Sequence, residues 1–155
     1  ADLAAGSGRD TFEWLDTMFD GLVSEGFRFT AVATITSAAS SVETLFTWSA
    51  ALRDRVRYLV VKNRVAGDDF GYFEETEPGR AFIAAAKPAV IGLRARAREI
   101  QTGLDNRGLT PAQMMAADAE RRGPLLDGGT ARIRAQAYAA QIDAALDSAR
   151  RMLLP

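Results

Sequence analysis

The chain contains no cysteine and no histidine among its 155 residues. Without them it has no disulfide, no thiolate or imidazole metal site, no cysteine nucleophile and no histidine-based catalytic triad. Lysine is scarce as well, since Lys62 and Lys87 are the only two. Chemistry at any site must therefore come from carboxylates, hydroxyls, arginine, these two lysines and backbone amides.

Neither sign of charge dominates, and no apolar run is long enough to cross a membrane. The 19 basic and 20 acidic residues give a net charge of -1, which offers no bulk attraction to nucleic acid or to an anionic membrane. No run approaches the roughly 18 apolar residues of a membrane span, and the N-terminus lacks the order of a signal peptide. We therefore expect a cytoplasmic location and no membrane span.

Apolar periodicity predicts an alternation of helices and strands. Asp10 and Glu13 form a candidate capping box for a first helix that Gly26 ends. Ser40 and Glu43 form a second candidate box. The first helix carries the stripe Trp14, Leu15, Met18, Phe19, Leu22 and Val23. Strands are expected at 27–35, 56–61 and 88–93, with further helices at about 40–55 and 79–86.

The last third of the chain reads as helical. Thr110 before Pro111 predicts an N-cap with proline at the first helical position, for a helix over 111–122 that Gly123 and Pro124 end. The segment that follows carries an apolar stripe, Tyr138, Ile142, Leu146, Ala149 and Leu153. Because strands alternate with helices before it, we expect an α/β fold with a parallel sheet, residues 1–105, and a C-terminal helical appendage, residues 106–155, packed on it.

Ligands of open parallel sheets collect at the carboxyl ends of the strands. The loops that leave the expected strands begin at Asp2, Thr36, Asn63 and Leu93. We expect Asn63 to lie at this end of the sheet, within side-chain reach of the loop that begins at Asp2.

With Asp2 and Asn63 in place, residues 1 to about 105 resemble the C-terminal half of a P-loop ATPase of the ParA/MinD type. This group includes plasmid partition and mobilisation ATPases and cobyrinate amidases. Its members have a strand that delivers an aspartate to the magnesium site, in a phrase similar to "DLAAGSG", and a later strand that ends in asparagine, often followed by arginine, as in "VVKNRV". The resemblance implies a three-layer P-loop NTPase fold, here partial.

The resemblance also implies site residues and cofactors. Asp2 would serve magnesium as a hard oxygen ligand or through water, and the Asn63 carboxamide would recognise the adenine edge, because it presents a donor and an acceptor together. Arg64, Leu93 and Arg94 would complete the nucleotide-binding set. ATP and Mg²⁺ are the implied cofactors.

The chain departs from the family at the phosphate-binding loop. That loop ends in Gly-Lys-Ser/Thr, whereas Lys62 and Lys87 follow Val61 and Ala86. The family's proline after the last strand is replaced by Leu93 and Arg94. We therefore expect the chain alone to be inactive, and to be the C-terminal part of a cytoplasmic ATPase that positions plasmid or other cargo. A homodimer through the nucleotide face or the C-terminal helix, and protein or DNA cargo, are the expected partners.

Each candidate residue also has a structural interpretation. Asp2 could be a solvated acid and Asn63 a turn residue with a left-handed backbone. Lys62 and Arg64 could face solvent at a strand end. Four further features have a functional and a structural interpretation. Asp68 and Asp69 are a carboxylate pair for metal or acid-base work, or a loop or helix start, and Phe70, Tyr72 and Phe73 are core or partner surface. The arginines Arg94, Arg96 and Arg98 are spread over helix faces or aligned toward an anion, and the C-terminal stripe is core or an interface.

The functional alternative to the ATPase is a non-catalytic α/β interaction domain. Such a domain would keep the fold and bind a partner through the aromatic loop at 70–73 and the helical tail.

Overall fold

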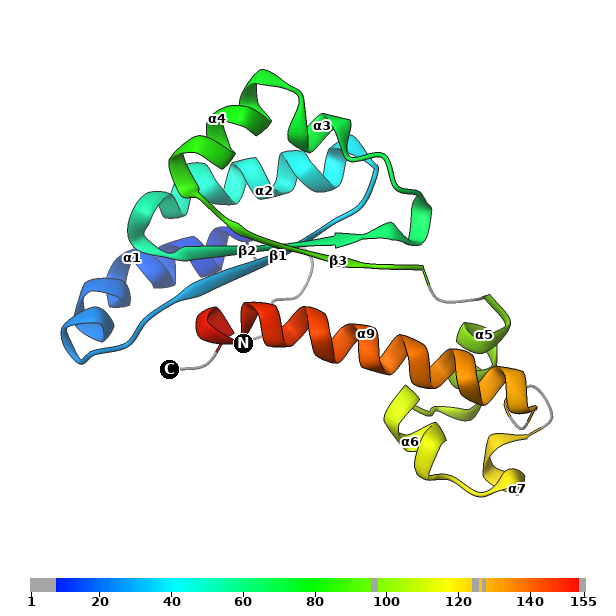
Figure 1. Ribbon diagram of the computed structural model, residues 1–155. Coiled ribbons are helices and arrows are strands. Elements are labelled where there is room, and N and C mark those ends of the chain that lie inside the picture. Colours follow the sequence, from blue (N-terminus) through cyan, green and yellow to red (C-terminus); the bar gives the residue numbers. More distant parts are fainter. Residues whose placement is uncertain (1–7, 96–97, 124–125, 127, 154–155) are drawn as a thin grey trace.

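The computed structural model of the chain describes residues 8–95, 98–123, 126 and 128–153. Three parallel strands form a sheet with helices on both faces (Figure 1). The elements in chain order are α1 Gly8–Ser24, β1 Thr30–Ile35, α2 Ala39–Leu52, η1 Arg53–Arg55, β2 Arg57–Asn63, η2 Arg64–Ala66, α3 Gly71–Glu74, α4 Glu77–Ala86, β3 Ala89–Leu93, α5 Arg98–Arg107, α6 Pro111–Ala116, α7 Ala119–Arg122 and α9 Gly129–Leu153. The predicted α/β class, parallel sheet and long C-terminal helix are confirmed.

The strands lie in their sequence order, β1-β2-β3, and each pair is parallel. The central strand β2 holds the buried run 58–61, because helices cover it on both faces. The edge strand β1 alternates as predicted: Ala31, Ala33 and Ile35 face the core under α2, whereas Val32 on the other face is 54% exposed. It begins at Thr30, and the expected first residue, Phe27, lies before it and is exposed.

Helices α2, α3 and α4 cover one face of the sheet (Figure 1). They enclose the main apolar core, in which Phe82 packs against Tyr58 of β2 and against Phe73 of α3. Thr76 caps α4 by accepting a hydrogen bond from the Gly79 amide, at 3.3 Å.

Because α2, α3 and α4 all lie on one face, both crossovers between the strands run on the same side of the sheet. Right-handed parallel connections between neighbouring strands require this arrangement.

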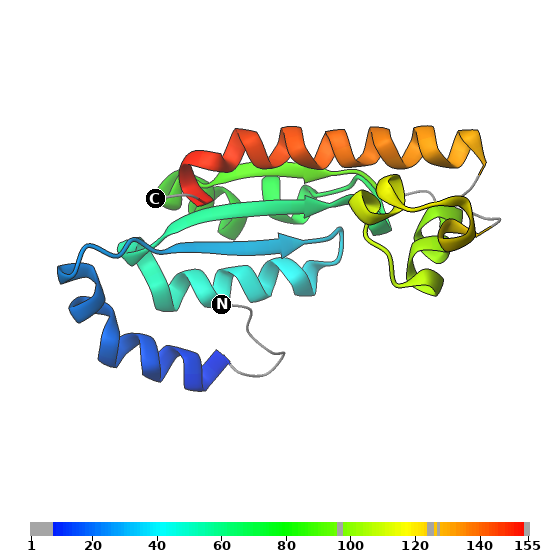
Figure 2. The same cartoon turned by 90° about the horizontal axis from the view of Figure 1, so that it is seen from below.

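The long helix α9 covers the opposite face, where it runs alongside β3 (Figure 2). Ala145 and Ala149 pack against Leu59, Val61 and Ile91 of the sheet. These small side chains let the helix backbone approach the strands closely. The predicted apolar stripe is therefore only partly correct, because Ala149 is buried while Leu146 and Leu153 are 43% and 40% exposed.

Helices α5, α6 and α7 pack around the first turns of α9 in a second cluster beyond the sheet (Figure 1). Thr110 is the N-cap of α6, as predicted from the Thr-Pro pair, and it also forms a capping box with Gln113 that was not predicted. The single helix expected over 111–122 is wrong: it breaks at Ala117, whose backbone is extended. Asp118 then accepts a hydrogen bond from the Arg121 amide at 2.8 Å and starts α7 as a new helix.

The two capping boxes predicted for the N-terminal helices are also wrong. Helix α1 begins at Gly8, so Asp10 lies inside its first turn. Helix α2 begins after Ala38, because the Thr36 and Ser41 hydroxyls bond the backbone of this turn and place Ser40 within the helix. Of the α1 stripe, Phe19 is buried, whereas the large side chains of Trp14, Met18 and Val23 are exposed.

Candidate functional site at the carboxyl end of the sheet

The structure places Asn63 and Leu93 side by side at the carboxyl end of the sheet. They are the last residues of β2 and β3, and their Cα atoms are register partners. The loop from Thr36 leaves β1 at the same end, because Ile35 pairs with Lys62. Asp2 lies outside the described residues, so its proximity to Asn63 stays a prediction.

Asn63 is held in a turn by its own carboxamide. Its Oδ1 accepts a hydrogen bond of 3.2 Å from the Val65 amide and caps η2. Asn63 is therefore a turn residue, and with φ of -85° and ψ of 106° its backbone is extended and not left-handed. Among the residues that the structure describes, the Asn63 amide NH₂ has no acceptor. The side chain therefore still offers donors to a ligand, together with the second lone pair of its oxygen.

Lys62 holds the strand end to α3, and the interpretation of Lys62 as a solvent-facing residue is wrong. Its side chain is only 14% exposed and pairs with Glu74. The ammonium lies 5.2 Å and 5.6 Å from the ring centres of Phe70 and Phe73, which are distances of cation–π contacts. Lys62 therefore has a structural partner at this site.

Arg64 crosses the neighbouring strand at Gly92. A Cβ added to Gly92 would lie 3.6 Å from Arg64 Nε, so the glycine leaves room for the guanidinium. One end of the guanidinium contacts Asp68, with 3.3 Å between Nη1 and Oδ1. Within the described ranges, Nε is buried without a hydrogen-bond partner, although the side chain as a whole is 41% exposed.

The carboxylates of this loop serve the backbone and Arg64. Asp69 accepts a hydrogen bond of 2.8 Å from the Gly71 amide, in the turn that leads into α3. Asp68 pairs with Arg64. Both carboxylates therefore lie in the loop before α3, which agrees with the interpretation of the pair as a loop or helix start. The described part of the chain contains no group of three or more carboxylates that could hold a metal ion.

The aromatic loop divides into core and surface. Phe70 and Phe73 are buried, whereas Tyr72 is 38% exposed. The Tyr72 hydroxyl donates a hydrogen bond of 3.0 Å to Glu43 Oε1 of α2. The pKa of Tyr72 lies above its usual 10.0, first because Glu43 accepts this bond and then through burial and the charge of Glu43. Only Tyr72 of the three is available to a partner.

Arg94 opens onto a second surface beyond the end of β3. A hollow of about 510 Å³ is lined by Arg94, by Ile100 of α5 and by Arg134, Tyr138 and Gln141 of α9. Two arginines therefore line one hollow, and the described residues of its lining include no carboxylate. Sequence reasoning missed the α9 residues, because only the packing of α9 against β3 brings them to Arg94. Arg96 lies outside the described residues, so alignment of the arginine run stays a prediction.

None of the described helices is both long enough and apolar enough to cross a membrane. Comparisons of the chain with protein families, with curated protein sequences and with solved structures found no match.

Proposed function

We propose that this chain is the C-terminal part of a ParA/MinD-like ATPase of the P-loop class, with ATP and Mg²⁺ as cofactors, and that the carboxyl end of its sheet faces the adenine base. The observation that carries the proposal is the pairing of Asn63 with Leu93 at the ends of two adjacent parallel strands. Ligands of such sheets bind outside this end.

The chemistry of this end suits a base rather than a triphosphate. The Asn63 NH₂ can donate to a purine edge, and half-buried Leu93 offers apolar surface beside it. The cations nearest to Asn63 have other partners, since Lys62 pairs with Glu74 and Arg64 with Asp68. The phosphates and Mg²⁺ would be held by Asp2 and by a phosphate-binding loop from a preceding segment of a longer protein.

The proposal is tested by nuclear magnetic resonance titration of the chain with ATP and Mg²⁺. We expect amide shifts to change at 63–65 and 92–95, with Asn63→Ala weakening the response and Asn106→Ala, an exposed residue of α5, leaving it intact. The chain alone should bind more weakly than a millimolar complex, so the titration extends to about 100 mM ATP, and shifts that are no larger at 63–65 and 92–95 than elsewhere, or that persist in Asn63→Ala, would refute the proposal.

A specific observation favours the interaction domain as a second candidate. Apolar side chains on α9 remain exposed although the helix is long and packed: Ile133 is 68% and Leu146 is 43% exposed. A homodimer or a protein partner would cover such residues. Light scattering on the wild type and on Ile133→Asp tests for a homodimer through α9. A smaller particle for the variant would support such an interface, and equal sizes would count against it.

A further inference from the structure

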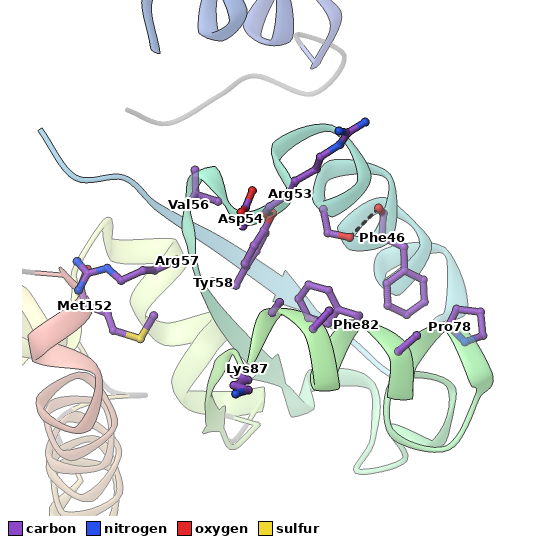
Figure 3. A pocket seen from close by; sticks show the side chains of 14 residues that line it. Phe46, Arg53, Asp54, Val56, Arg57, Tyr58, Pro78, Phe82, Lys87 and Met152 are labelled. Carbon is purple, nitrogen blue, oxygen red and sulfur yellow. Dashed lines mark hydrogen bonds between the residues drawn. The ribbon is translucent and has the colours of Figure 1, made fainter. Parts of the chain in front are cut away.

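A second hollow, of about 700 Å³, lies at the amino end of the sheet, away from Asn63 (Figure 3). Its walls come from α2, α4, η1 and the first residues of β2, and Met152 of α9 and Lys87 before β3 close its sides. Its volume falls within the range of about 300 to 1,000 Å³ that is typical of small-molecule sites.

The floor of this hollow is aromatic. Phe82 of α4 packs edge-on against Tyr58, with 5.4 Å between ring centres, and lies 6.0 Å from Phe46 of α2. Along the rim, α4 carries the small residues Ala81 and Ala85, which are exposed and leave the space between α2 and α4 open. The floor therefore suits an aliphatic or aromatic body.

Two cations stand on the ends of the helices that frame the hollow. Arg53 is the C-cap of α2 and Lys87 the C-cap of α4, and among the described non-glycine residues they alone have positive φ, at 51° and 45°. A helix C-terminus favours a cation. That preference explains why Arg53 and Lys87 stand at the helix ends. It does not explain the backbone conformation of Arg53, whose φ of 51° and ψ of -131° are typical of glycine in a tight turn.

Two hydrogen bonds, one of them from Tyr58 in the floor of the hollow, hold Arg53 in this unusual backbone conformation. The Tyr58 hydroxyl donates a hydrogen bond of 2.8 Å to the Arg53 carbonyl, and the Arg53 amide donates to Ser49. An L-residue kept in a conformation that costs free energy is a feature of ligand sites. Figure 3 shows the Arg53 side chain extending outward from the rim, above Tyr58.

The charges around the hollow favour an anion. The described lining contains three cations, Arg53, Arg57 and Lys87, and one carboxylate, Asp54. Arg57 is already engaged, because its guanidinium donates to the carbonyls of Arg151 and Met152. Arg53 and Lys87 are the cations that remain for a ligand in this part of the described structure.

We propose that this hollow binds a small amphipathic carboxylate, whose apolar body lies on Phe46 and Phe82 and whose acid group lies at the rim and pairs with Arg53. The site is independent of the proposed nucleotide-facing end and does not rest on it. Arg53 can hold a carboxylate with two parallel hydrogen bonds, so its contribution to affinity is measurable by substitution.

The test is titration of the chain with decanoate, monitored by amide chemical shifts and by calorimetry, with decanol as the uncharged probe. We expect saturable decanoate binding with shifts at 81–87, and much weaker binding of decanol. Arg53→Gly should weaken decanoate binding about tenfold or more, the value of one charged hydrogen bond, without lowering the melting temperature, because glycine suits this backbone.

A matched pair of variants tests the position of the ligand. Ala85→Trp fills the hollow and should abolish binding, whereas Ala84→Trp, on the same exposed helix but outside the lining, should not. The proposal is overturned if decanoate does not saturate below about 1 mM, if decanol binds equally well, if Ala85→Trp binds like the wild type, or if Ala84→Trp binds as poorly as Ala85→Trp.

Discussion

The Thr30 hydroxyl donates a hydrogen bond of 2.7 Å to the main-chain carbonyl of Met152, which ties the start of β1 to the last turn of α9. Arg57, at the start of β2, donates to the neighbouring Arg151 carbonyl at 3.2 Å. The last carbonyls of a helix have no partner within it. The amino end of the sheet therefore caps α9 and fixes its direction across the strands.

Thr30→Val should release this end of α9. The substitution keeps the side-chain shape but removes the hydroxyl, at a cost of about 0.5 to 1.5 kcal/mol for one hydrogen bond. We expect faster hydrogen exchange of the amides in the last turns of α9. Thr34→Val, at an exposed position on the same strand, is the control. Equal exchange in both variants would contradict the capping role.

Ala149→Leu should destabilise the docking of α9 on the sheet. Ala149 is 1% exposed and packs against Leu59, Val61 and Ile91, so a larger side chain has no room. Overpacking of this kind costs about 1 to 3 kcal/mol, which urea denaturation would measure. Ala144→Leu, at an exposed position of the same helix, should leave the free energy of unfolding nearly unchanged. A stable Ala149→Leu variant would mean that α9 does not lie on the strands as described.

Tyr58 should make the fold sensitive to alkaline pH. Burial, and then the charge of Asp54, raise the pKa of Tyr58 above its usual 10.0. A raised pKa disfavours the phenolate in the folded state, so the contribution is complete below the unfolded pKa and is lost as the pH rises through the folded one. We expect the free energy of unfolding to fall more steeply above about pH 10 in the wild type than in Tyr58→Phe. Parallel pH profiles would contradict this.

The chain alone should show no ATPase activity and at best weak nucleotide affinity. Without the amides and lysine of a phosphate-binding loop, little offsets the charge of a triphosphate or the charge that develops in phosphoryl transfer. Asn63 can add one or two neutral hydrogen bonds of about 0.5 to 1.5 kcal/mol each, less than the roughly 4 kcal/mol of a millimolar complex. Calorimetry and a phosphate-release assay measure both. Micromolar binding or turnover would contradict this account of the site and point to Arg9 or to the arginine run at 94–98 as phosphate ligands.

Sequence reasoning succeeded where the cause is local. The buried run of β2 and the Thr110 N-cap before Pro111 at the start of α6 follow from neighbouring residues. It failed where the partner is distant: the burial of Lys62 depends on Glu74 and on two rings of the next helix. The α1 stripe, of which Trp14, Met18 and Val23 are exposed, shows a related limit of sequence reasoning. Periodicity identifies the apolar face of a helix but not which element covers it.

The central claim is that Asn63 and Leu93 face the adenine base, and photolabelling tests it most directly. The chain would be irradiated with 8-azido-ATP, with and without excess ATP, and the labelled peptides identified by mass spectrometry. Our account predicts competed label at residues 63–66 and 92–95, and loss of that label in Asn63→Ala. Label confined to the hollow between α2 and α4, or label that ATP does not compete, would contradict it.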